Sequence, residues 1–355
     1  MAWRVNTRDP QWIAPLRMSV RTLLDRRKHP FHHHADVAYF VAERGGETVG
    51  RVAAVVNHIH NDFHGERTGF FGLFECDDDP QAAGTLLMAA ADWLRRRGME
   101  RIRGPFNLST NDEAGSPGVL IEGFDSAPTV MMSHNPPYYA RLLEAAGFEK
   151  TKDLLAYLIE DQTPPERLVR GVERLTSRAG ATIRGLDMRR LDEEISTIQD
   201  VYNSAWSRNW GFSPMTDDEF RFMAKDLRPI VDPELCLIAE VEGRAVGFSL
   251  ALPDLNQALR KIPSGRLLPF GIVHLLRTRR KINGFRVLTL GFRPGYQHLG
   301  LGAALYLRTW QVGAAKGYVY GEASWILEDN QDMRRPLENM GARVYRTYRV
   351  YERAL

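Results

Sequence analysis

The segment from Arg293 to Gly302 is the part of the chain best suited to chemistry. It reads Arg-Pro-Gly-Tyr-Gln-His-Leu-Gly-Leu-Gly and lies between an apolar run and a run of helical spacing. Glycines allow positive φ and let a ligand approach the backbone closely. Amide N–H groups at a helix start converge on one point, at the positive end of the helix dipole. The segment therefore predicts a pyrophosphate cradle. It lacks the lysine of a Walker loop and the third glycine of a dinucleotide fingerprint.

The elements that would position this cradle occur twice in the chain. Residues 39–57 and 236–256 each read as an apolar run, a polar turn and a second apolar run, which predicts a β-hairpin with its turn at Gly45–Gly46 or Glu242–Gly243. A glycine-bearing strand, a helix, a short second helix and an alternating strand follow in both halves. The repeat predicts two tandem α/β domains, residues 1–162 and 163–355, each a mixed, mostly antiparallel sheet flanked by helices.

The bulk composition is that of an ordinary globular protein. The 355 residues include 47 basic and 44 acidic side chains and only two cysteines, which argues against nucleic-acid binding and against a disulfide framework. No apolar run reaches the length of a signal core or a membrane span, so we expect a cytoplasmic protein. No metal site is expected, because the histidine runs have no suitably spaced partners. The oligomeric state stays open.

A basic stretch, residues 260–286, contains no acidic residue and includes the apolar run Leu-Leu-Pro-Phe-Gly-Ile-Val-His-Leu-Leu. Such a segment can lie on a membrane surface, fold over an anionic ligand, or pack its apolar stripe on its own domain. It joins the second hairpin to the strand before the cradle. That position favours a role in covering the cofactor or the acceptor over contact with a membrane.

The second half resembles the GCN5-related N-acetyltransferase (GNAT) superfamily. Its signature, Gln or Arg, two residues, Gly, one residue, Gly or Ala, is matched by the segment from Gln297 to Gly302, and Asn330 precedes a short helix that ends at Gly341. The resemblance implies two tandem acyl-CoA N-acyltransferase folds with splayed strands. It also implies an acyl-CoA co-substrate, most simply acetyl-CoA, held by Leu290, Gly291, Phe292, Gln297, His298, Leu299, Gly300, Leu301, Gly302, Ala303 and Asn330.

The first half departs from the signature at the corresponding place. Gln81 and Gly84 keep the spacing, but Leu86 replaces the small residue, and the three aspartates 77–79 lie just upstream. Aspartates at that position would repel a pyrophosphate. We therefore expect a degenerate first half that binds CoA poorly and completes the acceptor cleft.

The residues that would catalyse the transfer are less clearly marked. Family members commonly supply an acid from a tyrosine at the position that is Leu337 here. Tyr345 is the preferred substitute, and strand alternation predicts that Tyr348 faces the opposite side of the sheet. Glu322, Ser324 and Glu328 are candidates for the base, although carboxylates near strand ends are more often solvated or ion-paired.

The acceptor pocket is expected to draw on tryptophans and amides, which suit a small organic amine. The candidates are Asn209, Trp210, Asp254, Asn256 and Trp325, with ordinary core packing as the alternative for the tryptophans. The sequence thus predicts an acyl-CoA-dependent N-acyltransferase acting on a small-molecule amine. Two alternatives stay open: a CoA-binding pseudoenzyme or sensor, and a tandem transferase that uses aminoacyl-tRNA.

Overall fold

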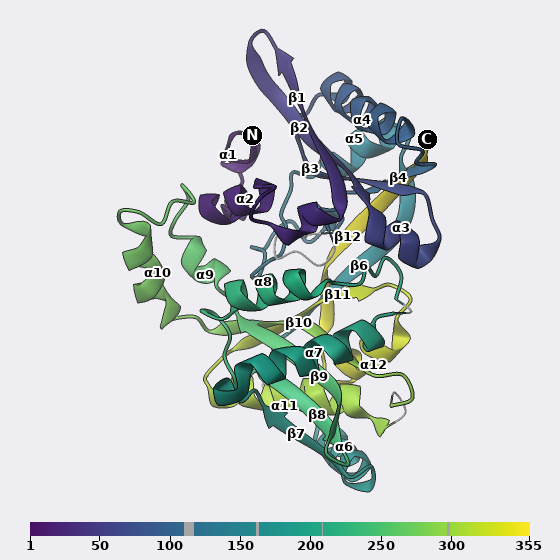
Figure 1. Cartoon of the computed structure of the whole chain (residues 1–355). Coiled ribbons are helices and arrows are strands. Elements are labelled where there is room, and N and C mark those ends of the chain that lie inside the picture. The colour runs from purple at the N-terminus through teal and green to yellow at the C-terminus, as the bar shows by residue number, and fades with distance from the viewer. Residues whose placement is uncertain (110–116, 161–162, 208, 297–298) are drawn as a thin grey trace.

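The computed structural model describes residues 1–109, 117–160, 163–207, 209–296 and 299–355. One twisted sheet runs through both halves of the chain, with helices packed against its faces (Figure 1). The strands are β1 (Ala35–Arg44), β2 (Glu47–Asn57), β3 (Thr68–Cys76), β4 (Arg101–Gly104), β5 (Val119–Glu122), β6 (Glu149–Ile159), β7 (Ala181–Gly185), β8 (Cys236–Val241), β9 (Arg244–Pro253), β10 (Gly284–Phe292), β11 (Tyr320–Leu327) and β12 (Arg343–Ala354).

The described helices are distributed over both halves. The first half contains α1 (Ala2–Asn6), α2 (Arg17–Leu24), the 3-10 helix η1 (Pro30–His33), α3 (His58–His64), α4 (Pro80–Arg95) and α5 (Tyr139–Ala145). The second contains α6 (Glu166–Arg178), the 3-10 helix η2 (Met188–Arg190), α7 (Leu191–Ala205), α8 (Asp217–Leu227), α9 (Asn256–Leu259), α10 (Gly271–Arg279), α11 (Leu301–Ala315) and α12 (Gln331–Asn339). Of the described residues, no helix is long and apolar enough to cross a membrane.

Both predicted hairpins are present, as β1–β2 and β8–β9. Each has a two-residue turn in which both central residues have positive φ: 59° and 83° at Gly45 and Gly46, and 51° and 75° at Glu242 and Gly243. Such turns match the right-handed twist of the paired strands. The helices predicted at residues 80–97 and 300–316 are also confirmed, as α4 and α11, with ends within two residues of the prediction.

Each half contains a pair of parallel strands that separate along their length. In the second half, β10 pairs with β11 from Gly284 to Val287. A β-bulge between Val287 and Thr289 follows on the β9 side, and no described residue of β10 beyond Val287 pairs with β11. In the first half, β3 and β4 pair only from Thr68 to Phe70. The expected splayed α/β fold is therefore confirmed.

The last strand of each half pairs with the second strand of the parallel pair in the other half. The order across the sheet is β1-β2-β3-β4-β12-β6-β11-β10-β9-β8-β7, with β5 also paired to β12. Thus β12 lies against β4, whereas β6 lies against β11, and the two exchanged strands pair with each other. The halves consequently share one sheet. The division at residue 162 stays a prediction, and residues 161–162 lie outside the described part of the chain.

The three largest apolar clusters of the described residues hold this arrangement together. One packs α4 and α5 against the first half of the sheet, and a second packs α11 and α12 against the second half. The third lies between the halves, where Leu23 of α2 and Phe31 of η1 meet Tyr348 and Val350 of β12. The third core places first-half side chains beside the splayed strands of the second half.

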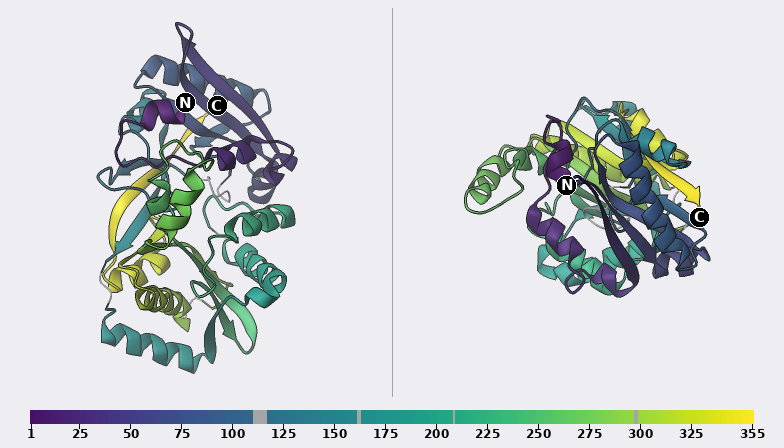
Figure 2. Two further views of the ribbon diagram at one scale, coloured as in Figure 1. Left: turned by 90° about the vertical axis from the view of Figure 1, so that its left-hand side faces the viewer. Right: turned by 90° about the horizontal axis from the view of Figure 1, so that it is seen from above.

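The basic stretch at residues 260–286 does not fold as expected. Its helix α10 packs against α9 and projects from the edge of the molecule (Figures 1 and 2). Ile272, Val273 and Leu276 of α10 are exposed, and Leu275 is partly buried. This position of α10 does not support the prediction that the segment covers the cofactor or the acceptor.

Candidate acyl-transfer site

The predicted cradle forms the start of α11. Gly300 caps this helix with φ of 71°, a left-handed conformation that glycine adopts without strain. The next three residues, Leu301, Gly302 and Ala303, supply first-turn N–H groups that have no partner within the helix. Leu299 donates from its backbone to Tyr296 O. Gln297 and His298 lie outside the described residues, so the predicted pyrophosphate site is described here from Leu299 to Ala303.

The corresponding helix start in the first half is already occupied by a carboxylate. Asp79 caps α4, and its Oδ1 accepts hydrogen bonds from Gln81 N at 3.0 Å and Ala82 N at 3.1 Å. Arg44 forms an ion pair with Asp79. The N–H groups that would face a pyrophosphate therefore already serve the protein's own side chain, which supports the expectation of a degenerate first half.

The splayed part of β10 presents its backbone toward the gap beside β11. Leu290 and Gly291 pair with Ser249 and Phe248 of β9 on one edge only. The Leu290 side chain packs into the core under α11, whereas Gly291 lies against the Trp206 ring on the opposite face. This geometry fits the pairing with pantetheine that the sequence predicts. Asn330, predicted to contact the same group, caps α12 by accepting from Met333 N at 3.2 Å.

A buried ion pair lies where the two strands begin to separate. Arg286 of β10 and Glu322 of β11 are register partners, with 3.4 Å between Arg286 Nε and Glu322 Oε2. Their exposed fractions are 0% and 1%. Arg286 also donates to Ser324 Oγ at 3.0 Å and to Val130 O at 2.8 Å. Its guanidinium is thereby held in place, while Glu322 Oε1 has no hydrogen-bond partner among the described residues.

Burial gives Glu322 the properties of a proton acceptor. It raises the pKa of this carboxyl to about 7, against the opposing effects of the Arg286 charge and of hydrogen bonds from Ser324 and Thr129. A base whose pKa lies near the working pH combines a useful ionised fraction with a useful affinity for protons. Perturbed carboxyls of this kind gather at functional sites. Glu322 is therefore the strongest of the predicted base candidates.

The first half supplies one wall of this buried cluster. Thr129 Oγ1 donates to Glu322 Oε2 at 3.3 Å, and Val130 N donates to Asp254 Oδ1 at 2.8 Å. Asn256 Nδ2 donates to Thr129 O at 2.7 Å. Met131 follows with φ of 61°, a conformation that costs a bulky residue roughly 1–2 kcal/mol. The predicted acceptor residues Asp254 and Asn256 thus position a strained first-half segment over the base.

Tyr345 and Tyr348 lie on the same side of the sheet, which corrects the prediction from alternation. The register of β12 against β6 shifts between Val344 and Arg346, so Tyr345 occupies a β-bulge. Such a bulge inserts one residue and resets the facing of those that follow. Both rings consequently contact the core between the halves.

The two hydroxyls have different surroundings. Tyr348 Oη donates to Ser133 O at 3.0 Å and accepts from Arg346 at 3.2 Å. Tyr345 Oη is buried beside Thr129 without a hydrogen bond of good geometry. Burial raises the pKa of Tyr345 far above its usual value, so the hydroxyl keeps its proton at neutral pH. It is suited to donate a hydrogen bond to a ligand.

We expect Tyr345→Phe to lower kcat at least about tenfold with little change in CoA affinity or Tm, because only a free hydroxyl is lost. Tyr348→Phe should instead lower Tm, because Ser133 O loses its donor, and should leave kcat close to the wild-type value. Thermal unfolding and steady-state kinetics on both variants measure this contrast. Wild-type kcat in Tyr345→Phe would exclude the hydroxyl from the reaction.

Of the other predicted site residues, some lie beside this cluster and some lie apart from it. Trp325 lies with its ring 4.5 Å from the Arg286 guanidinium carbon, and its buried Nε1 has no partner among the described residues. Trp210 packs at the edge of the same core, next to Asn209. Glu328 is separate from the cluster: it accepts from Lys150 Nζ at 2.8 Å and from Asp153 N at 3.1 Å. An ion-paired carboxylate of this kind is a poor candidate for the base.

The comparisons with known proteins agree with this geometry. The chain is 40% identical to bacterial ceramide synthase of Caulobacter vibrioides over 99% of its length and 92% of that protein. It is 36% identical to protein YghO of Escherichia coli over 98% of its length and 89% of that protein. The chain belongs to the family of these two proteins. It is an acyltransferase, as the sequence predicts. No family model matches the chain.

Solved structures show the same fold at low identity. A GCN5-related N-acetyltransferase from Sphaerobacter thermophilus is similar with a TM-score of 0.51 and 17% identity, covering 87% of this chain and 78% of that one. A tandem GNAT protein from the clavulanic acid pathway gives a TM-score of 0.51 and 12% identity, covering 90% and 83%. The predicted tandem GNAT fold is therefore confirmed over most of the chain.

Sequence reasoning missed Arg286 and Thr129. Arg286 was grouped with the basic stretch, although it stands between Phe285 and Val287 in an otherwise apolar strand. A charge in such a strand must be paired or functional, and Glu322, in a similar apolar strand, was the partner to look for. Thr129 lies in a first-half loop without a periodic pattern, and no local signal marks it.

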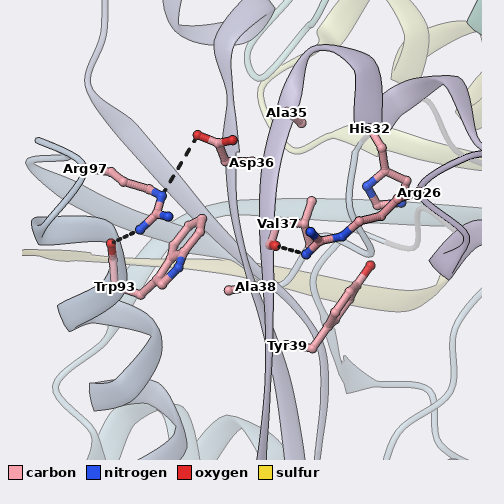
Figure 3. Close-up of a pocket in the computed structure, with 9 residues that line it drawn as sticks. All are labelled: Arg26, His32, Ala35, Asp36, Val37, Ala38, Tyr39, Trp93 and Arg97. Carbon is pink, nitrogen blue, oxygen red and sulfur yellow. Dashed lines mark hydrogen bonds and ion pairs between the residues drawn. The ribbon is translucent and has the colours of Figure 1, made fainter.

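A cavity of about 650 Å³ lies in the first half beside β1, and none of its lining residues belongs to this cluster (Figure 3). Arg26 donates to Val37 O at 2.6 Å, and Arg97 lies over the Trp93 ring at 3.6 Å and near Asp36. Both arginines are thus engaged with the protein, and the lining offers no buried carboxyl like Glu322. The Arg286–Glu322 cluster is therefore the stronger candidate for acyl transfer. The cavity is lined by Arg26, His32, Ala35, Asp36, Val37, Ala38, Tyr39, Trp93 and Arg97.

Proposed function

We propose that this chain transfers a fatty acyl group from acyl-CoA to the primary amine of a long-chain, sphingoid-type lipid. The observation that carries the proposal is the similarity to bacterial ceramide synthase along nearly the whole of both chains. A ceramide is the amide of a fatty acid with a sphingoid base, so its formation requires an amine acceptor and an activated acyl donor. The comparison gives no support to acetyl-CoA, which the sequence analysis favours.

The residues of the cluster fit the steps of such a transfer. The acceptor is mostly an ammonium ion at neutral pH and must lose a proton before its nitrogen attacks the thioester carbonyl carbon. Glu322 Oε1, which has no partner in the described structure, can take that proton. The C–N bond forms and the C–S bond breaks. The second proton of the acceptor nitrogen passes to the departing sulfur, so that CoA leaves as the thiol, and the Tyr345 hydroxyl would donate a hydrogen bond to that sulfur as it leaves.

The surroundings of the cluster suit an apolar acceptor. Trp325, Trp210 and Met132 belong to one neighbouring apolar group, and Leu288 of β10 and Leu252 of β9 belong to another. Because Glu322 is buried, an acceptor reaches it only if a covering segment moves. The first-half segment 128–132, with its strained Met131, is the candidate for that movement.

The experiment compares acceptors and donors in one assay. Purified full-length chain is incubated with acyl-CoA esters of increasing chain length and with sphinganine, a short alkyl amine or a polyamine, and the amide product is measured by mass spectrometry. We expect turnover with sphinganine and a long-chain acyl-CoA. Turnover confined to acetyl-CoA with polar amines would contradict the proposal.

Two further outcomes correspond to the alternatives from the sequence. Binding of acyl-CoA without turnover of any amine would favour a pseudoenzyme or sensor. Transfer from labelled aminoacyl-tRNA, in the absence of acyl-CoA, would favour the tRNA-dependent reaction. Either result would overturn the assignment, because the proposed reaction needs both the thioester and the amine.

A further inference from the structure

The exposed tip of the basic stretch is the largest group of exposed apolar side chains close together in the described sequence. Leu268 and Phe270 are 75% and 72% exposed, just before α10. Ile272, Val273 and Leu276 follow at spacings that place them on one face of α10, and all three are exposed. These five residues are called the apolar tip. Contiguous exposed apolar groups of this kind mark a binding surface more often than a free one.

Basic side chains surround the apolar tip. Arg266 precedes it, and Arg277, Arg279, Arg280 and Lys281 follow it, all exposed. Within the described residues, none of these five side chains makes an ion pair with an acidic group, whereas exposed arginines such as Arg4 and Arg101 do. Unpaired positive charge around apolar side chains is complementary to an anionic bilayer surface, where the charges meet phosphates and the apolar groups enter the acyl region.

The base of the tip is fixed to the body of the protein. Arg17 donates from its backbone to Gly265 O at 2.9 Å and from Nε to Ser264 O at 2.8 Å. Trp3 Nε1 donates to Pro263 O at 3.1 Å. The N-terminal segment therefore holds the tip in a defined orientation, so apolar residues exposed on it are presented outward rather than folded back.

The chain links the tip directly to the wall of the buried cluster. Asp254 and Asn256 contact the first-half segment over Glu322. Asp254 precedes α9 and Asn256 begins it, and Leu268 lies only a short stretch further along the chain. We infer that the apolar tip and the five basic side chains around it dock the protein on an anionic membrane surface. This binding is separate from catalysis, although a membrane-resident amine acceptor would be the reason for it.

The test measures binding without turnover. The full-length chain is sedimented with vesicles of equal parts phosphatidylglycerol and phosphatidylcholine, and with vesicles of phosphatidylcholine alone. We expect salt-sensitive co-sedimentation with the anionic vesicles. The double variant Leu268→Ser/Phe270→Ser should reduce the partition coefficient at least about tenfold, because two apolar side chains no longer enter the bilayer.

Matched controls separate the tip from general surface effects. Val41→Ser/Met88→Ser removes apolar side chains of similar exposure, 63% and 55%, from the first half and should leave binding unchanged. Neutralising Arg277, Arg279, Arg280 and Lys281 to Gln should weaken binding to anionic vesicles, whereas neutralising four exposed arginines of α6 should not. The α6 control set is Arg167, Arg170, Arg174 and Arg178.

The outcomes are distinguishable from those of the proposed function. Activity of the tip variants on detergent-dispersed sphinganine reports the chemistry alone, and we expect it to be kept. Equal sedimentation of the wild type and the Leu268→Ser/Phe270→Ser variant would overturn the membrane inference, whatever the enzyme acylates. An equal loss of binding in each tip variant and in its matched control would overturn it too. Binding to tRNA in preference to vesicles would also overturn it.

Discussion

Replacing Glu322 with Gln is expected to lower kcat by roughly 10²–10⁴-fold, the usual contribution of a positioned base. The amide keeps the shape of the carboxyl but cannot take a proton from the acceptor. CoA affinity should be nearly unchanged, because the cradle at Gly300 lies on a different element. Release of free CoA thiol, followed with a chromogenic reagent, measures the rate. Calorimetry measures CoA binding.

The pH profile gives a second readout of the same group. Burial raises the pKa of Glu322 to about 7, and the ionised form is the active base. The wild-type kcat should therefore rise with pH through an apparent pKa near this value and fall as the pH drops below it. Glu322→Gln should lose this limb of the profile. A purely structural role would change the size of kcat and leave its pH dependence in place.

Glu328→Gln is the matched control for this prediction. Glu328 is the other carboxylate predicted on the same strand region, but it pairs with Lys150 away from the cluster. We expect the control to keep kcat within about threefold of wild type, as for a surface ion pair of small energetic weight. A large loss of kcat in Glu328→Gln, with no loss in Glu322→Gln, would reverse the assignment of the base.

Local sequence patterns predicted the helices and strands, but not which strands pair with each other. The turns at Gly45–Gly46 and Glu242–Gly243 follow from residues that accept positive φ, and the starts of α4 and α11 follow from apolar periodicity. The exchange of β6 and β12 between the two halves does not follow from any such local pattern. An alternating strand shows which of its faces is buried, but its pattern does not say which neighbour accepts its hydrogen bonds.

The candidate site shows the same division between local and long-range information. The cradle was predictable because its chemistry is contained in consecutive residues. The buried cluster joins strands and a loop far apart in the chain, as in the contact between Thr129 and Glu322. The side of the sheet on which Tyr345 lies depends on a β-bulge. The bulge inserts one extra residue, so the prediction from strand alternation was wrong.

Substituting Gly300 tests the cradle with a pair of variants that differ only in charge. Gly300 has φ of 71°, and a Cβ there would meet Leu175 Cδ1 at 2.9 Å, at the far end of a flexible side chain. Asn tolerates this backbone conformation better than most residues, and Asp has nearly the same shape. Gly300→Asn therefore reports the steric effect, and Gly300→Asp adds one negative charge beside the expected pyrophosphate.

We expect wild-type chain to bind one CoA, Gly300→Asn to bind it somewhat more weakly, and Gly300→Asp to bind it about 100-fold more weakly than Gly300→Asn. Two charges about 5 Å apart interact by roughly 3 kcal/mol at an effective dielectric constant near 20, enough for that difference. Titration calorimetry gives both the affinity and the number of sites. Only one site is expected, because Asp79 already occupies the N–H groups at the start of α4. Equal affinity in the two variants would mean that the pyrophosphate lies elsewhere, and two sites of similar affinity would show that the first half keeps a working cradle.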